Sequence, residues 1–355
     1  MKATTEIKVL KIAKSRIHEV DFNNLGFGKE VTDHMFVAEY KNGSWGDAQI
    51  MLFSNISMAP NALALHYGQT VFEGMKAFRM VDGRISIFRL DDHFKRFNIS
   101  LRRMCMPEVS YELFSNALIE LIKTDEAWLK NIKGTSLYLR PFMIATEERF
   151  GVKVSEQYKF FIFAGAVGEY YSKPLKVKVE PNFTRAVKGG TGFAKCGGNY
   201  GGSFYPTRLA QQQGFDQIIW TDSTDELNIE ESGTMNVMFV IDGVLTTPVL
   251  SETILSGITR DSLLKLASVL GYKISEQKIS FTFLESQLKK GNISEAFGCG
   301  TAAVISSIES INMKGIDYKL PASTTNSFSK KALEMLLKIR LGEIDDNFNW
   351  NTIIG

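Results

Sequence analysis

The sequence predicts a mixed α/β protein with two domains. The chain has 355 residues, 44% of them hydrophobic, which is enough to form two buried cores. Strand and hairpin patterns alternate with amphipathic helical patterns along both halves. Residues 168–181 lose this periodicity and contain Pro174 and Pro181, which indicates a connection between domains. We therefore expect a first domain over residues 1–169, a linker over 170–181 and a second domain over 182–355.

The elements of the first domain follow from hydrophobic spacing and turn residues. Apolar side chains recur every three or four residues in two segments, and Asp82-Gly83 is typical of a hairpin turn. We expect a hairpin at residues 76–80 and 84–88, helices at 90–104 and 110–123, and buried strands at 137–142 and 160–164.

The second domain shows the same kinds of signal. Gly214 and Gly271 each follow an amphipathic segment and predict helix ends, and Asp242-Gly243 predicts another hairpin. We expect a strand near Val177, a helix at 202–213, a strand at 217–221, a hairpin at 236–241 and 244–247, and a helix at 262–270.

Composition narrows the classes of partner. There are 41 Lys and Arg against 39 Asp and Glu, so no basic field favours nucleic acid or an anionic membrane. No apolar run approaches the roughly 20 residues that span a bilayer, and residues 1–20 lack a secretory apolar segment. Cys105, Cys196 and Cys299 are too far apart to predict disulfides or a zinc site, and the histidines lack metal-ligand spacing. We expect a cytoplasmic protein without a bound metal that acts on small molecules.

The most informative segment is the loop at residues 191–202. It places Lys195 among five glycines and close to Asn199 and Tyr200. Glycines allow a backbone to approach a bound molecule closely, so the loop is consistent with a reactive amine beside a cofactor. A flexible surface loop with a solvated lysine is the alternative.

Two glycine-containing segments are candidates for binding a phosphate. Residues 256–260 precede a predicted helix, and a helix N-terminus presents free N–H groups to an anion. Residues 298–303 are expected to form a glycine-rich turn that ends in a hydroxyl and small side chains. Each segment alone is also consistent with an ordinary helix start or a tight turn.

Two further segments contribute charged groups. Residues 229–236 place two acids ahead of a buried strand, where a carboxylate must meet a cation or shift its pKa. Arg96 lies between the apolar Phe94 and Phe97 on a predicted helix, so it either binds an anion or is solvated. A reactive lysine, a buried acid and a phosphate site together are what pyridoxal 5′-phosphate requires.

Seven motifs carry a resemblance to a known family. They are Gly28-Lys29 with residues 32–35, and the segments at 65–67, 72–78 (FEGMKAF), 134–141 (GTSLYLRP), 195–201 (KCGGNYG), 231–236 (ESGTMN) and 298–302 (GCGTA). From about Phe27 onward the chain resembles the branched-chain amino-acid aminotransferases of the class IV, fold-type IV pyridoxal-phosphate family. The resemblance implies a smaller N-terminal α/β sandwich domain and a larger C-terminal barrel-like α/β domain.

The resemblance also implies the residues of the site. Lys195 would form the Schiff base and shuttle protons, Glu231 would pair with the pyridine nitrogen, and Tyr200 would bind the phenolic oxygen. The remaining cofactor residues would be Arg96, Ile258, Thr259 and Thr301 at the phosphate, and Thr234. The substrate pocket would be lined by Phe27, Tyr67, Phe72, Tyr138, Arg140, Tyr170, Thr234 and Ala302, with Phe150 and Val152 contributed by the partner in a homodimer.

The implied activity is reversible transamination of L-leucine, L-isoleucine and L-valine with 2-oxoglutarate by a ping-pong mechanism. Arg140 and tyrosine hydroxyls would bind the second carboxylate of glutamate. Residues 303–306 replace the Cys-x-x-Cys pair of animal members, so we expect no thiol switch of that type.

Three alternatives share parts of this pattern. The pair Tyr138 and Arg140 argues against an aminodeoxychorismate lyase, which would release pyruvate. A D-amino-acid aminotransferase is closer, although such chains are usually shorter and lack the long motif set. A non-catalytic module that only binds the cofactor would not require both Lys195 and Glu231.

Overall fold

The computed structural model describes residues 7–168 and 173–354. These residues form two units. The first unit contains residues 7–168, 194–198 and 339–354, and the second contains 173–193 and 199–338. The predicted second domain included 194–198 and the C-terminal segment, but the structure groups both with the first unit. Backbone pairing explains this correction, because Val71 bridges to Cys196 and residues 351–354 pair with residues 85–88.

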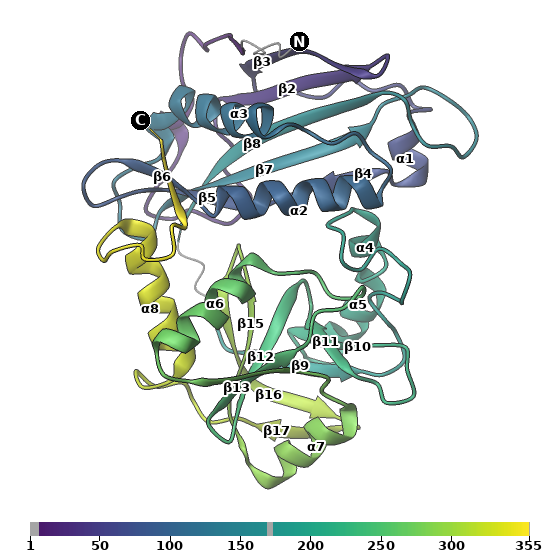
Figure 1. The fold of residues 1–355 in the computed structure, drawn as a ribbon, viewed down its shortest axis with the longest axis vertical. Helices are drawn as coiled ribbons and strands as arrows, with labels where there is room; N and C mark the ends of the chain where they lie inside the picture. The colour runs from purple at the N-terminus through teal and green to yellow at the C-terminus, as the bar shows by residue number, and fades with distance from the viewer. Residues whose placement is uncertain (1–6, 169–172, 355) are drawn as a thin grey trace. The chain divides into compact units, whose positions relative to one another are not determined.

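The first unit is built on one nine-stranded sheet (Figure 1). The strands run in the order β1-β3-β2-β8-β7-β5-β6-β18, and β4 also pairs with β7. The strands are β1 (Lys8–Val9), β2 (His34–Lys41), β3 (Ser44–Leu52), β4 (Thr70–Phe72), β5 (Met75–Arg79), β6 (Ile85–Phe88), β7 (Ser136–Ala145), β8 (Tyr158–Val167) and β18 (Asn351–Ile354). The predicted hairpin at 76–88 is confirmed, and Gly83 adopts the positive φ of 87° that its turn requires.

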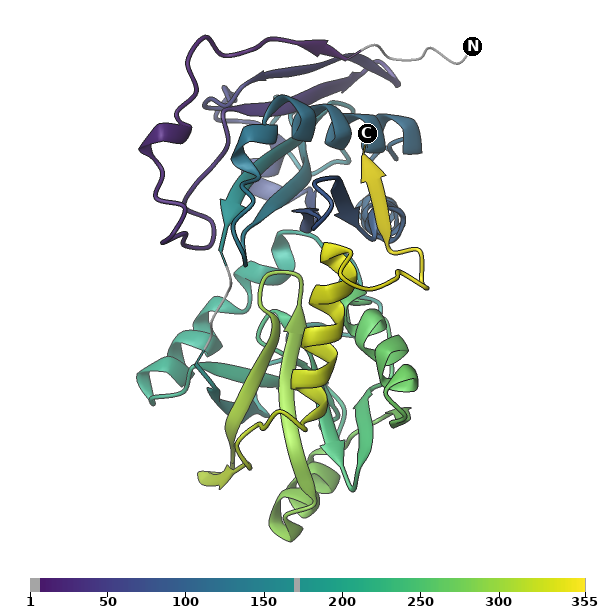
Figure 2. The same ribbon diagram turned by 90° about the vertical axis from the view of Figure 1, so that its left-hand side faces the viewer.

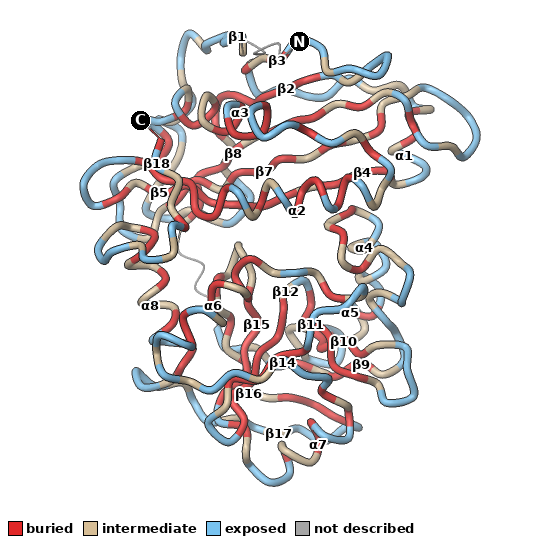
Figure 3. Tube along the Cα trace, viewed as in Figure 1, coloured by how far each residue is buried: buried red, intermediate tan, exposed pale blue. Residues whose placement is uncertain are grey.

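Two long helices supply most of the remaining core of the first unit. The predicted helices are confirmed as α2 (Leu90–Arg103) and α3 (Tyr111–Thr124), and the Ser110 hydroxyl caps α3 by accepting from the Leu113 N–H. Phe97 and Phe114 pack on Phe160 of β8, and all three are fully buried. Figure 3 shows this burial as red segments along the central strands. The shorter helices are α1 (Leu63–Tyr67) and the 3-10 turns η1 (Ile17–Glu19) and η2 (Glu126–Trp128).

The segment before β2 is anchored by a buried carboxylate. Asp33 accepts hydrogen bonds from the Ser15 hydroxyl, the Arg16 N–H and the Trp128 indole N–H. Burial raises the pKa of Asp33, but these bonds outweigh it, so the pKa lies below the ordinary 3.8. Asp33 therefore joins the N-terminal segment to the rest of the unit as a carboxylate.

The second unit is a closed barrel with extensions, as the resemblance implies. Its strands run β11-β10-β9-β16-β15-β12, and pairing of β11 with β12 closes the ring. β13 and β14 extend the sheet beyond β12, and β17 pairs with β16. The strands are β9 (Leu175–Glu180), β10 (Gln217–Thr221), β11 (Ile229–Ser232), β12 (Met235–Ile241), β13 (Val244–Pro248), β14 (Lys273–Gln277), β15 (Ile293–Gly300), β16 (Val304–Met313) and β17 (Ile316–Lys319).

Helices cover parts of this barrel, and α8 lies along it in Figure 2. The start of α8 packs Phe328 and Ala332 against Phe297 of β15 and Met238 of β12. The helices are α4 (Gly198–Gly201), α5 (Phe204–Gln212), α6 (Ile258–Val269), α7 (Phe281–Lys290) and α8 (Phe328–Leu341). No helix among the described residues is long and apolar enough to cross a membrane.

Three local predictions for the second unit can be compared with the structure. The hairpin at 236–247 is confirmed, and Asp242 and Gly243 both have positive φ, at 48° and 77°. The helix predicted at 262–270 begins earlier, at Ile258. The predicted glycine-rich turn at 298–303 is partly wrong, because residues 298–300 belong to β15 and only 301–303 connect it to β16.

Candidate active site

The predicted lysine loop lies along the edge of β4. The Phe72 N–H donates to the Lys195 carbonyl at 3.0 Å, and the Gly197 N–H donates to the Thr70 carbonyl at 3.2 Å. A Cβ atom on Gly197 would lie 2.7 Å from the Thr70 methyl carbon. A glycine is therefore needed at position 197 for the loop to approach β4.

The backbone of Lys195 is also tied to α2. Its N–H donates to the Ser100 hydroxyl at 2.9 Å, and that hydroxyl donates to the Arg96 carbonyl at 3.0 Å. The Lys195 side chain is partly buried, and its Nζ atom lies 4.7 Å from the centre of the Phe72 ring. The amine is thus held beside an aromatic face and is not a solvated surface group.

Phe72 and three other predicted pocket residues form a connected group of side chains. The Arg140 guanidinium carbon lies 4.8 Å from the Phe72 ring centre and 5.3 Å from the Tyr138 ring centre. Arg140 Nη2 donates to the Tyr138 hydroxyl at 2.9 Å, and Phe27 meets the Tyr138 ring edge to face at 5.0 Å. Because Tyr138 and Arg140 are two residues apart on β7, both side chains project from one face of the sheet. The structure therefore brings Lys195, Phe72, Tyr138, Arg140 and Phe27 together.

Gly74 makes room for this arrangement. A Cβ atom at Gly74 would lie 2.0 Å from the Tyr138 hydroxyl oxygen. No side chain can occupy that space without displacing the phenol ring. The glycine of the 72–78 motif is therefore required by Tyr138, which is distant along the chain.

Arg96 is held by a buried carboxylate that the sequence did not identify as functional. Its Nε atom donates to Glu73 Oε1 at 2.7 Å and its Nη2 atom donates to Glu73 Oε2 at 2.8 Å. His93 Nδ1 lies 2.8 Å from Glu73 Oε2, and the Gly74 N–H donates to that oxygen at 3.1 Å. Burial alone would raise the pKa of Glu73, but Arg96 and His93 bring it well below its usual range.

The Glu73 pair fixes the orientation of the guanidinium, because a bidentate contact leaves it little freedom to rotate. The sequence contained one signal for this role, since Glu73 is a charged residue inside a mostly apolar motif, which also contains Lys76. The alternative of a solvated Arg96 is wrong, because both side chains are buried.

Tyr67, Phe150 and Val152 lie in a more exposed part of the first unit. The side chains of Phe150 and Val152 are 88% and 83% exposed, and Tyr67 is partly exposed. The Gly151 N–H donates to the Tyr67 hydroxyl at 3.2 Å, which connects this loop to α1. Tyr170 lies outside the described residues.

The second unit has a cavity that unites three predicted cofactor residues, Tyr200, Glu231 and Thr234. Glu231 is buried, Tyr200 is partly buried and Thr234 is exposed. The residues lining the cavity are Arg185, Asn199, Tyr200, Ser203, Glu231, Gly233, Thr234 and Leu255.

Leu255 and Arg185 are both partners of Glu231. The Leu255 N–H donates to its Oε1 atom at 2.7 Å, and Arg185 Nε lies 3.1 Å from its Oε2 atom in an ion pair. Arg185 thus supplies a cation beside this buried acid, and the pairing of Glu231 with a pyridine nitrogen stays a prediction. Sequence reasoning missed Arg185, because no motif surrounds it and its partner is distant along the chain.

The start of α6 is a buried helix terminus that lacks a side-chain cap. Gly257 is the N-cap residue, and Ile258 and Thr259 are the first two helical residues, both buried. A Cβ atom on Gly257 would lie within 1.8 Å of the Asn236 side-chain oxygen, so the glycine allows that side chain to pack here. Unsatisfied N–H groups with a positive dipole end suit an anion such as a phosphate.

Thr301 and Ala302 lie in the connection between β15 and β16, and both are partly buried. Gly298, on β15, lies against Met235, because a Cβ atom there would be 2.6 Å from the Met235 methyl carbon. Gly298 and Gly300 both lie against Met235 of the neighbouring strand, so they continue β15 and do not form a turn.

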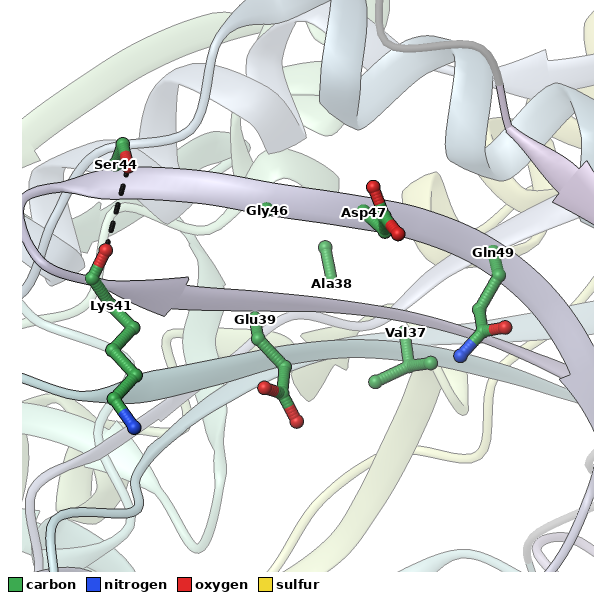
Figure 4. A pocket seen from close by; sticks show the side chains of 8 residues that line it. All are labelled: Val37, Ala38, Glu39, Lys41, Ser44, Gly46, Asp47 and Gln49. Carbon is green, nitrogen blue, oxygen red and sulfur yellow. Dashed lines mark hydrogen bonds between the residues drawn. The ribbon is translucent and has the colours of Figure 1, made fainter.

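Other candidate sites are weaker. Within residues 7–168 and 173–354, no group of three or more His, Cys, Asp or Glu side chains could hold a metal ion. The hollow in Figure 4 lies at the β2–β3 hairpin, where the Ser44 hydroxyl donates to the Lys41 carbonyl. It contains none of the predicted site residues.

Comparison with known proteins identifies the family. The family model for amino-transferase class IV matches residues 70–311. Branched-chain-amino-acid transaminase 1 of Bacillus subtilis (strain 168) is 42% identical over 335 residues, covering 93% of this chain and 94% of the relative. The branched-chain aminotransferase of Thermoproteus uzoniensis, solved with norvaline, is similar with a TM-score of 0.74, 25% identity and coverage of 91% and 100% of the two chains.

A further structure in the group has a bound cofactor derivative. The T.th. branched-chain amino acid aminotransferase, complexed with N-(5′-phosphopyridoxyl)-L-glutamate, matches with a TM-score of 0.72 and 25% identity, covering 90% of this chain and 98% of that one. The closed barrel, the contact of the lysine loop with β4 and the sequence identity over most of the chain are all consistent with one family. This chain belongs to the class IV aminotransferases and, within them, to the branched-chain-amino-acid aminotransferases.

Proposed function

We propose that this protein transfers the amino group of L-leucine, L-isoleucine or L-valine to 2-oxoglutarate, reversibly, with pyridoxal 5′-phosphate as cofactor. The products would be the branched-chain 2-oxo acids and L-glutamate. The observation that carries the proposal is the position of Lys195 Nζ, 4.7 Å from the Phe72 ring that also faces Arg140. The names of the relatives support the substrate class, and the phosphopyridoxyl complex of one relative supports the cofactor.

The residues present fit pyridoxal phosphate in their chemistry. The buried start of α6, without a side-chain cap, suits the phosphate. Glu231 is a buried carboxylate already engaged by one cation, and such a group favours a protonated ring nitrogen. When bound, the cofactor supplies an electron-withdrawing ring that stabilises negative charge at the substrate Cα.

Each predicted cofactor residue then has a role. Lys195 would bind the aldehyde carbon covalently, Glu231 would face the ring nitrogen and Tyr200 would donate to the phenolic oxygen. Fixation of the Arg96 guanidinium by Glu73 supports a role in binding the phosphate. The backbone N–H groups of Ile258 and Thr259, with Thr301 and Thr234, would complete the set.

The substrate pocket would combine an apolar wall with one strong carboxylate ligand. Phe27, Phe72 and Tyr67 supply apolar surface for a branched side chain. Arg140 Nε is buried without a hydrogen-bond partner among the described residues, so it is a donor that the second carboxylate of glutamate would satisfy. Ala302 is the other described pocket residue, and Tyr170 remains a prediction.

Lys195 would move the proton in each half of a ping-pong reaction. Once displaced by the substrate amine, Lys195 Nζ would take the proton from the substrate Cα and pass it to the aldehyde carbon of the cofactor. The second half runs in reverse with 2-oxoglutarate.

The test is to load the purified protein with pyridoxal phosphate and assay leucine with 2-oxoglutarate. The wild type should be yellow and should produce 4-methyl-2-oxopentanoate and glutamate. Borohydride reduction should add the cofactor mass to the peptide containing Lys195. Lys195→Ala should lose both colour and activity. Lys188 is an exposed lysine just before the loop, so Lys188→Ala should keep both. Failure of the wild type to take up pyridoxal phosphate would refute the proposal.

A survey of donors separates the alternatives. Activity with L-leucine but not with D-alanine would exclude a D-amino-acid aminotransferase, and absence of pyruvate from aminodeoxychorismate would exclude the lyase. Cofactor uptake without turnover of any donor would indicate the non-catalytic module.

We also propose that the protein is a cytoplasmic homodimer. The exposed apolar side chains of Phe150 and Val152 support a surface that a second copy would cover. The free state of Cys105, Cys196 and Cys299 is consistent with a reducing compartment. Sedimentation of the wild type as a dimer, and weaker association of Phe150→Ser, would support the assembly, and a monomer at micromolar concentration would refute it.

A further inference from the structure

Two neighbouring carboxyl groups on β11 are both removed from solvent. Glu230 is 4% exposed and Glu231 is 2% exposed. Successive residues of a strand normally point to opposite faces, so two buried acids in a row need partners on both sides. Only Glu231 has a role in the reaction proposed above.

A single arginine is connected to both acids. Arg185 Nε forms the ion pair with Glu231 Oε2 at 3.1 Å. Arg185 Nη2 donates to the carbonyl groups of Gly192, at 3.0 Å, and Thr253. The Thr253 hydroxyl in turn donates to Glu230 Oε1. The guanidinium of Arg185 therefore contacts Glu231 directly and is connected to Glu230 through Thr253.

The second oxygen of Glu230 is unusual. Its Oε2 atom is buried and has no hydrogen-bond partner within the described part of the chain. A carboxylate oxygen in that state is costly, and protonation removes the cost. Glu230 is thus the acid of this pair that can exist in either charge state.

The charged groups around Glu230 come from three segments. Arg185 lies in the segment after β9, Asp222 follows β10, and Glu231 is on the same strand. Burial raises the pKa of Glu230 to about 7. The negative charges of Glu231 and Asp222 raise this pKa further, whereas the hydrogen bond from Thr253 and the positive charge of Arg185 lower it. Hydrogen bonds from Asn228 and Thr224 outweigh burial and lower the pKa of Asp222, so Asp222 stays ionised.

We propose that Glu230 is a positioning residue that acts through Arg185 and sets how strongly Glu231 attracts the ring nitrogen of the cofactor. The inference rests on the proposed function, in which Glu231 faces that nitrogen. When Glu230 is neutral, Arg185 compensates the charge of Glu231 alone. When Glu230 is ionised, the field of Arg185 is divided between two carboxylates, and Glu231 favours a protonated ring nitrogen more strongly.

The experiment uses holoenzyme loaded with pyridoxal phosphate labelled with ¹⁵N in the ring. The ¹⁵N chemical shift reports how far the shared proton lies toward the nitrogen, independently of turnover. In the wild type this shift should move toward the protonated position as pH rises through about 7, where Glu230 ionises. In Glu230→Gln the step should disappear, and the nitrogen should stay at the less protonated position at pH 8.

Two further variants make the outcome specific. Glu226→Gln removes an exposed acid of the neighbouring loop and should titrate like the wild type. Thr253→Val removes the hydrogen bond that lowers the pKa of Glu230, so the step should move to higher pH. This variant also decides the question if Glu230→Gln does not fold.

The results separate this inference from the proposed function. A protein that binds no pyridoxal phosphate would refute both. Bound cofactor with the same ¹⁵N titration in wild type and Glu230→Gln would overturn the role of Glu230 and leave the proposed function intact. An unmoved step in Thr253→Val would have the same meaning.

Discussion

Replacement of Glu73 by glutamine should destabilise the protein far more than loss of an ordinary surface ion pair. The change keeps the shape of the side chain but removes its charge. Arg96 then keeps a buried guanidinium opposite a neutral amide, and His93 loses its carboxylate neighbour. Breaking a buried pair by removing one partner costs about 3–5 kcal/mol. The free energy of unfolding of Glu73→Gln should therefore fall by about this amount.

The assay is urea unfolding of the apoprotein followed by circular dichroism. The matched control is Glu126→Gln, because Glu126 pairs with Arg79 at 3.1 Å but is 53% exposed. An exposed ion pair contributes about 0–1 kcal/mol, so Glu126→Gln should hardly change the free energy of unfolding.

A double variant completes the cycle. Glu73→Gln combined with Arg96→Met removes both charges, so it should be more stable than the sum of the two single changes. The reasoning is refuted if Glu73→Gln costs no more free energy of unfolding than Glu126→Gln.

Two further outcomes follow from the packing and from pH. Gly74→Ala should lower kcat/KM for leucine on the order of 100-fold, because the new Cβ would lie 2.0 Å from the Tyr138 hydroxyl and displace it. Gly46→Ala, whose Cβ would meet only a carbonyl at 3.6 Å, should leave kcat/KM unchanged, and equal activity of the two variants would contradict the argument. Burial raises the pKa of Asp33, but its hydrogen bonds lower the pKa by more, so the pKa is lower in the folded protein than in the unfolded chain. The stability that Asp33 contributes is therefore fully present above pH 3.8 and is lost as the pH falls through the pKa of the folded state. Asp33→Asn should therefore lose less stability than the wild type between pH 5 and pH 3 in urea unfolding, and an identical loss would show that Asp33 is not linked to folding.

Local sequence patterns predicted much of the secondary structure. Both hairpins carry Asp-Gly at the turn, where a positive φ is required, and such a requirement depends on two residues alone. The helix of Phe94 and Phe97 follows from spacing along one face. The start of α6 was placed too late, at residue 262, whereas the helix begins at Ile258 directly after Gly257, which packs against Asn236.

The sequence predicts the reactive residues of the candidate site but not all of the groups that hold them. Lys195 and Glu231 are surrounded by residue types that suggest their chemistry, so the sequence predicts a role for each. Glu73 stood out only as a charged residue in the 72–78 motif, and no motif surrounds Arg185. Their positioning roles follow from the ion pairs with Arg96 and Glu231, at 2.7 and 3.1 Å.

The sequence by itself determined the family, the alternation of strands and helices, and the lysine that should carry the chemistry. These features depend on neighbours along the chain or on motifs of a few residues. Only the tertiary structure decided that residues 194–198 of the lysine loop join the first unit, that Glu73 orients Arg96, and that Arg185 is connected to two buried acids. Those outcomes depend on which distant segments share a sheet edge or a buried space, because the charge and burial of a group are set by its neighbours in space.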